Sequence, residues 1–141
     1  MAIDYKNSPL EAEFERQLQA HGISYRREVK AIPKRRFRVD FVIDPWRIAV
    51  EIEGGIWLGN KGRHTNPVGY QRDCEKYNLL ALNRYALLRF TTKHVKDGSA
   101  LATTLELIEL KKEQQQCSNL YSPRSTLARC RSIMLRLRVP G

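Results

Sequence analysis

Residues 35–55, RRFRVDFVIDPWRIAVEIEGG, constrain the fold of this chain more than any other stretch. Their alternating apolar residues predict one β-strand over residues 36–43 and a second over residues 47–53, with an Asp-Pro turn between them. Three acids stand inside these strands: Asp40, Glu51 and Glu53. A carboxylate in the strand of a sheet core is costly unless it is paired or binds a cation, so these acids need an explanation.

The flanking sequence predicts a small α/β domain. We expect helices over residues 8–21, 69–83 and 98–113, and further strands over residues 23–30 and 85–91. The order helix, three strands, helix, strand, helix is typical of a mixed central β-sheet flanked by helices. The 141 residues fit one domain, with a core large enough to fold without disulfides.

Side-chain positions in the predicted helices follow from their spacing. Ser8 is expected to cap the first helix, with Glu11 completing a capping box three residues later. In the second helix, Tyr77, Leu80 and Ala81 are expected to face the core. The capping box gives Glu11 a structural role, which competes with a catalytic role for the same side chain.

Charge and composition limit the classes of partner and compartment. The formal net charge is +10 and the pI is near 9.9, which favours a polyanionic partner such as nucleic acid. Much of the excess lies in residues 111–141, which hold seven Lys or Arg and one Glu. No apolar run is long enough to span a bilayer and the N-terminus does not resemble a signal peptide, so we expect a cytoplasmic protein without a membrane partner. The three cysteines form no CxxC pair, which argues against a zinc site.

The acids of the two strands have a chemical interpretation. Glu51 and Glu53 are two residues apart and point to the same face, where Asp40 joins them if the strands pair as a hairpin. Such a carboxylate cluster suits Mg²⁺, with Mn²⁺ as the alternative, and such an ion activates phosphodiester hydrolysis. The competing interpretation is a solvated polar face on which the acids pair with nearby arginines: Arg35, Arg36, Arg38 and Arg47.

A long segment rich in Gly, Asn and Pro, residues 54–70, follows the second strand. Its His64 is suited to proton transfer near neutral pH, and the competing interpretation is a surface histidine. Asp73, at the expected start of the next helix, either caps that helix or orients His64. Trp57 and Tyr70 bracket the segment. We expect both in the core, with stacking on nucleic-acid bases as the alternative.

The stretch RVDFVIDPWRIAVEIEGGIW resembles the core of the very-short-patch repair endonucleases, which belong to the PD-(D/E)XK nuclease superfamily. The matching features are the R-x-D-F opening, the D-P-W-R turn, the second strand ending in Gly54, and Trp57. Further on, DCEKYNLLALNRYALLRFT is similar to the next helix and strand of that family, so the resemblance covers roughly residues 8–95. The chain also resembles phage and homing nucleases with an E-D-x-H-D arrangement, which implies a phage or mobile-element relationship. The matching residues are Glu11, Asp40, His64 and Asp73.

The resemblance implies a restriction-endonuclease-like core and a role for each matching residue. The implied catalytic set is Glu11, Asp40, Glu51, His64 and Asp73. In that set His64 would act as the general acid or base. The implied metal ligands are Asp40, Glu51 and Glu53. The basic residues expected to contact DNA are Arg35, Arg36, Arg38, Arg63 and Lys76, of which the last two would hold the scissile phosphate.

The chain departs from the family patterns at two places. Glu53 stands where the D/E-x-K motif of the superfamily has its lysine, and Lys76 or Arg63 is the candidate replacement. The loop after Trp57 lacks the histidine cluster of the repair enzymes, and no cysteines are placed for their structural zinc site. The departures bear on mismatch recognition and on the source of positive charge in the site.

The sequence therefore predicts a Mg²⁺-dependent DNA endonuclease that nicks DNA, as a monomer or a homodimer. The alternatives are a catalytically inactive DNA-binding protein with a nuclease fold, and an endonuclease specific for branched or mismatched DNA. Residues 1–113 would form the nuclease domain, and residues 114–141 a basic tail that is flexible, contacts DNA or forms a strand. A phage-encoded protein would act in the cytoplasm of its host.

Overall fold

The computed structural model describes residues 8–54 and 67–119. The elements follow one another in the order α1 (Pro9–Ala20), β1 (Tyr25–Val29), β2 (Val39–Ile43), β3 (Ile48–Glu53), α2 (Pro67–Leu82), β4 (Ala86–Thr91), α3 (Thr92–Lys96) and α4 (Ser99–Asn119). Each helix and strand expected from the sequence is present, and the short helix α3 is an addition. The described contacts divide the chain into two units between Leu105 and Glu106, within α4.

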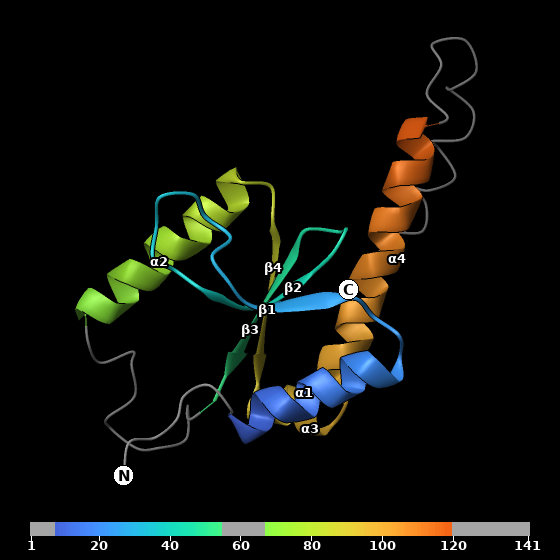
Figure 1. Ribbon diagram of the computed structural model, residues 1–141, viewed down its shortest axis with the longest axis horizontal. Helices are drawn as coiled ribbons and strands as arrows, with labels where there is room; N and C mark the ends of the chain where they lie inside the picture. The colour runs from blue at the N-terminus through green and yellow to red at the C-terminus, as the bar shows by residue number, and fades with distance from the viewer. Residues whose placement is uncertain (1–7, 55–66, 120–141) are drawn as a thin grey trace, which may run out of the picture. The chain divides into compact units, whose positions relative to one another are not determined.

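The four strands form one mixed sheet in the order β1-β2-β3-β4 (Figure 1). The β1–β2 and β2–β3 pairs are antiparallel, and β3 and β4 are parallel. The predicted hairpin is confirmed, because Val42 pairs with Ala49 and Ile43 with Ile48. Parallel neighbours need a crossover connection, and α2 lies in the segment that joins β3 to β4. Helix α2 lies on one side of the sheet, and α1 and α3 lie on the other (Figure 1).

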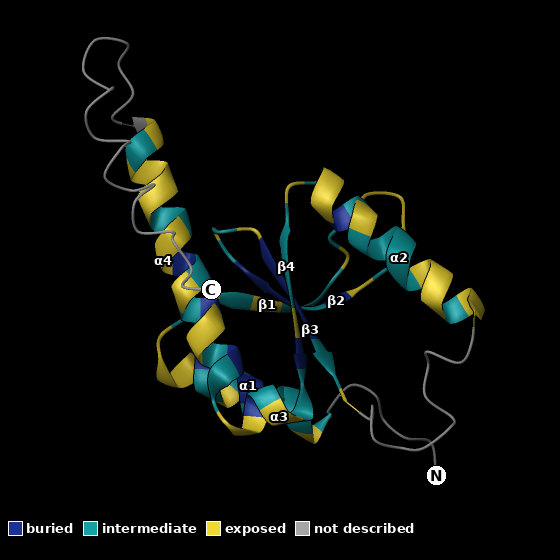
Figure 2. Cartoon of the chain, turned by 180° about the vertical axis from the view of Figure 1, so that it is seen from behind, coloured by how far each residue is buried: buried dark blue, intermediate teal, exposed yellow. Residues whose placement is uncertain are grey.

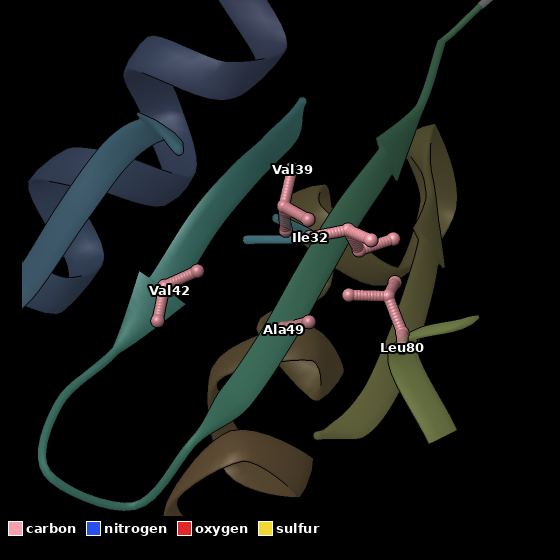
Figure 3. Close-up of a cluster of buried hydrophobic side chains, with 5 residues drawn as sticks. All are labelled: Ile32, Val39, Val42, Ala49 and Leu80. Carbon is pink, nitrogen blue, oxygen red and sulfur yellow. The ribbon is translucent and has the colours of Figure 1, made fainter. Parts of the chain in front are cut away.

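The core under α2 explains why this helix stays on the sheet. Five buried apolar residues meet there: Ile32, Val39, Val42, Ala49 and Leu80 (Figure 3). Leu80 comes from α2 and is fully buried, as its spacing predicts. Ala81, which was also expected to face inward, is exposed, so that expectation is wrong. The inward stripe of α2 therefore passes through Tyr77 and Leu80 and does not reach Ala81.

The core under α1 is built around one aromatic side chain. Phe14 is fully buried, and its ring centroid lies 5.4 Å from that of Phe41 on β2 and 5.9 Å from that of Phe90 on β4. Leu18, one helical turn further on, is also fully buried. Burial is greatest in β2 and β3, the two central strands (Figure 2). The acids of these two strands, Asp40, Glu51 and Glu53, thus lie next to buried apolar residues.

Several element ends differ from the sequence-based expectation. The side chain of Ser8 makes no capping hydrogen bond to α1, so the expected capping box is wrong. Helix α4 continues past residue 113 to Asn119, into the segment expected to be tail. Residues 120–141 lie outside the described residues, and their role stays a prediction. Within residues 8–54 and 67–119, no helix is both long enough and apolar enough to cross a membrane.

Candidate active site

A row of charged residues crosses the sheet at one level. The register places Glu28 of β1 opposite Asp40 of β2, between the pairs Arg27↔Phe41 and Val29↔Val39. One step beyond the pair Phe41↔Val50, Asp40 stands opposite Glu51 of β3, which in turn pairs with Arg89 of β4. Directly opposed residues share a face of the sheet, so this row brings acids from three strands together.

These acids line a cavity of about 240 Å³. Its walls come from α1, the first three strands and α2. The lining residues are Glu11, Glu28, Asp40, Glu51, Ile52, Glu53, Asp73, Lys76 and Tyr77. The cavity contains every predicted catalytic acid, and it also contains Lys76. His64 and Arg63, which were predicted to act here, belong to residues 55–66 and lie outside the described residues, as does Trp57.

Glu51 and Lys76 form the most buried charged contact of the cavity. The Lys76 Nζ lies 2.6 Å from Glu51 Oε1, and each side chain is 12% exposed. The ammonium is close enough to donate to Oε1 and to neutralise part of the Glu51 charge. A largely buried acid–lysine pair in a cavity lined by further acids marks a functional position more often than a structural one.

The two central carboxylates of the cavity, Glu51 and Asp40, bind protons more tightly than ordinary ones. Burial raises the pKa of Glu51 to about 7, against the opposing effect of the positive charge of Lys76, and the negative charge of Asp40 adds to the increase. Burial also raises the pKa of Asp40, although the Ile52 N–H, which donates to Asp40 Oδ2 at 2.7 Å, and Lys76 both oppose the increase. The negative charge of the cavity is therefore not fully compensated by the described side chains, and a cation would stabilise it.

Glu11 reaches the cavity from α1 and is held there by Arg27. The Arg27 Nη2 donates to Glu11 Oε2 at 2.8 Å, and Nη1 donates to Glu15 Oε2 at 2.9 Å. The guanidinium also lies over the ring of Phe41, 5.2 Å from its centroid. Burial and the charge of Asp40 raise the pKa of Glu11, against the effect of Arg27. Glu11 is thus oriented by a partner that the sequence analysis did not single out.

Glu53 is neutralised from the neighbouring strand. Both Nε and Nη2 of Arg89 donate to Glu53 Oε1, at 3.0 and 2.8 Å, and the Tyr77 hydroxyl donates to the same oxygen at 3.4 Å. Arg89 also lies over the Tyr77 ring, 4.6 Å from its centroid. The negative charge of Glu53 is therefore matched by an arginine on β4.

Asp73 has a different place in its helix from the one expected. Helix α2 begins at Pro67, so Asp73 lies beyond the first turn and does not cap the N-terminus. Instead it lines the cavity. Tyr70, expected in the core, is 59% exposed, so that expectation is wrong as well.

The three arginines just before β2 differ in whether they form ion pairs. Arg35 contacts Glu75 at 2.6 Å, and Arg38 lies 3.8 Å from Glu28 of the cavity. Arg36 is exposed and makes no ion pair with any described residue. Among the described residues, none of the arginines named for the solvated-face interpretation pairs with Asp40, Glu51 or Glu53, so that pairing is wrong.

The donors of the cavity fit a hard divalent cation in chemistry. Among residues 8–54 and 67–119, no three acid, histidine or cysteine side chains are placed to hold one metal ion. Mg²⁺, however, commonly binds one or two carboxylates and completes its shell with water and substrate phosphate. Asp40 and Glu51 supply two carboxylates on one face of the sheet, and both line the cavity. The remaining predicted ligand, Glu53, is already engaged by Arg89.

Comparison with known proteins gives a likeness of fold. No protein-family model matches the chain, and no curated protein sequence matches it. The solved structures that match include the catalytic domain of the homing endonuclease I-Bth0305I. That structure covers 71% of this chain and 92% of its own length, with a TM-score of 0.51 and 17% sequence identity. At this identity the likeness shows the fold alone, and with the mixed four-stranded sheet it confirms the predicted nuclease-type α/β fold class.

Proposed function

We propose that this protein is a metal-dependent DNA endonuclease with its active site in the carboxylate cavity. One observation carries the proposal: acids from α1, three strands and α2 line a single cavity around the largely buried pair of Glu51 and Lys76. The fold of the homing endonuclease catalytic domain supports the reaction class. The net charge of +10 supports a polyanionic substrate.

Asp40 and Glu51 would hold Mg²⁺, with Mn²⁺ as the alternative, because their oxygens face the same cavity from neighbouring strands. When bound, the ion would supply Lewis-acid activation of the scissile phosphate and of the attacking water. The Ile52 N–H fixes one oxygen of Asp40 and leaves the other oxygen to face a ligand. Glu53 is a weaker candidate ligand, since Arg89 and Tyr77 already share its Oε1.

The remaining side chains of the cavity have positioning and proton-transfer roles in this proposal. Glu11, oriented by Arg27, bounds the cavity on the α1 side, and Asp73 bounds it on the α2 side. His64 would move the proton of the attacking water or of the leaving group. Lys76 takes the place of the lysine that the superfamily carries at the position of Glu53, and its ammonium would stabilise the charge that develops on the phosphate.

The substrate surface would use the basic side chains near the cavity. Arg35, Arg36 and Arg38 lie just before β2, the strand that carries Asp40. Arg36 is exposed and without an ion-pair partner among the described residues, which leaves its charge for a phosphate. Arg63 would contribute from the segment next to His64. A monomer would carry one active site and nick one strand, and a homodimer would cut both.

A second function rests on the acid at position 53. If the charge normally supplied by lysine is needed there, the protein binds DNA without cutting it. The pairing of Glu53 with Arg89 weakens this alternative, because the local charge is balanced. A structure-specific endonuclease for branched or mismatched DNA would use the same cavity and differ in substrate.

Cleavage of supercoiled plasmid tests the proposal. The full chain is incubated with plasmid in Mg²⁺, and in parallel with excess EDTA. Open-circle product that forms with Mg²⁺ alone supports a nickase, and linear product supports an acting dimer. If plasmid, mismatched duplex and four-way junction are all bound but none is cut, the endonuclease proposal is wrong and the binding-only function replaces it.

A further inference from the structure

The ammonium of Lys76 already acts as a cation inside the carboxylate cavity. Its Nζ contacts Glu51 Oε1 at 2.6 Å, and the electrostatic effect of Lys76 reaches Asp40 as well as Glu51. Lys76 is the one cationic side chain among the described residues that line this cavity. It therefore occupies one oxygen of a carboxylate that the proposed function assigns to the divalent ion.

Two cations cannot use the same buried carboxylate oxygen. Their mutual repulsion is strong where the surroundings exclude water, and both the lysine and Glu51 are largely buried. The other basic partners at the cavity are committed elsewhere, since Arg27 holds Glu11 and Arg89 holds Glu53. A divalent ion that binds Glu51 Oε1 would therefore displace Lys76, and the flexible stem of lysine permits this movement.

We propose that Lys76 is a resident counter-ion that competes with the divalent metal ion for Glu51. This inference rests on the proposed function. When the metal ion binds, the ammonium leaves Glu51 and becomes available to a phosphate oxygen of the substrate. Metal and phosphate binding are then coupled through one side chain: the metal frees Lys76 for the phosphate, and a phosphate that holds Lys76 raises the affinity for the metal by the same factor.

Calorimetric titration of Mg²⁺ into the full chain, without DNA, tests the competition. Wild type is compared with Lys76→Met, which keeps the length of the side chain and removes its charge. The matched control is Lys93→Met, because Lys93 also forms an ion pair but is 79% exposed and lies on α3, away from the cavity lining. We expect Lys76→Met to bind Mg²⁺ about tenfold more tightly than wild type, and Lys93→Met to bind like wild type.

A measurement on the unsubstituted chain keeps the test independent of the folding of Lys76→Met. Lysine labelled with ¹³C at Cε gives one NMR signal for each side chain, and the signal of Lys76 is assigned as the one missing from Lys76→Arg. Added Mg²⁺ should shift the Lys76 signal toward those of exposed lysines and leave the Lys93 signal in place. A Lys76 signal that does not respond while Mg²⁺ binds overturns the competition.

The outcomes separate this inference from the proposed function. Equal or weaker Mg²⁺ binding by Lys76→Met, with clear binding by wild type, overturns the competition and leaves a metal-dependent nuclease in place. No Mg²⁺ binding by either protein contradicts the metal dependence itself, and the competition with it. Tighter binding by Lys76→Met combined with a shift of the Lys76 signal in wild type supports both.

Discussion

Replacing Glu51 by glutamine should change how the stability of the protein depends on pH. The folded-state pKa of Glu51 is about 7, against an ordinary value of 4.5, because the carboxylate is buried. Between these values the folded chain holds a proton that the unfolded chain releases, so stability falls as pH rises. At about 1.4 kcal/mol for each unit of pKa, the full loss is about 3.4 kcal/mol. Roughly 2.5 kcal/mol of it falls between pH 5 and pH 8.

Urea unfolding of wild type and Glu51→Gln at pH 5 and pH 8 measures this contribution. The glutamine does not titrate, so the stability of wild type minus that of the variant should fall by about 2 to 3 kcal/mol from pH 5 to pH 8. Any pH-independent cost of placing an amide beside Lys76 cancels in this comparison. Glu109→Gln is the matched control, because the Glu109 side chain is 65% exposed.

One outcome of the urea experiment would contradict the burial of the Glu51 charge. If the stability difference between wild type and Glu51→Gln is the same at pH 5 and pH 8, the Glu51 carboxylate is not destabilised by burial. The argument that the cavity holds uncompensated negative charge then fails.

Three further predictions concern the surroundings of the cavity. Arg27→Met should lower the free energy of unfolding by about 2 to 3 kcal/mol, measured in urea, because it leaves two partly buried carboxylates without their shared partner. Leu80→Ala should cost about 2 to 5 kcal/mol in the same assay, since the side chain is fully buried under α2, and a loss below about 1 kcal/mol would contradict the packing described. Arg36→Ala should leave stability unchanged and reduce the slope of log affinity for DNA against log salt by about 1, and an unchanged slope would remove Arg36 from the DNA surface.

The central hairpin could be predicted because its signals are local. Alternation with period two fixes which residues share a face, so Glu51 and Glu53 had to lie together, and the short Asp-Pro turn placed Asp40 beside them. The first and second helices also carried their own apolar spacing. Helix α3 has only five residues, which are too few for an apolar repeat to be recognised in the sequence. Its start is marked by a contact seen only in three dimensions, in which the Thr91 N–H donates to His94 Nδ1 at 3.1 Å.

The partners of the acids could not be predicted, because they come from elements distant in sequence. Arg27 reaches Glu11 from β1, and Arg89 reaches Glu53 from β4 only once β3 and β4 are known to be parallel neighbours. The place of Glu28 opposite Asp40 also follows only from the register in which β1 pairs with β2.

Rules based on local sequence gave the wrong positions for Glu11 and Asp73, because tertiary contacts at the cavity determine where these side chains lie. The capping box fits the spacing of Ser8 and Glu11, yet the attraction of Arg27 determines where the Glu11 carboxylate lies. Asp73 was placed at a helix start, but α2 begins at Pro67, six residues earlier. Element ends are the least certain part of sequence-based prediction, since fraying and capping depend on tertiary contacts.

The central claim is that the carboxylate cavity cuts DNA, and the most direct test is the rate of plasmid cleavage by Asp40→Asn in Mg²⁺. Asparagine can still accept the hydrogen bond from the Ile52 N–H, so the fold should persist. Asp44→Asn is the matched control. Asp44 directly follows β2, pairs with Arg26 and does not line the cavity. We predict that Asp40→Asn cuts at least about 100-fold more slowly than wild type while Asp44→Asn cuts normally. Equal cleavage by wild type and a folded Asp40→Asn would contradict the account.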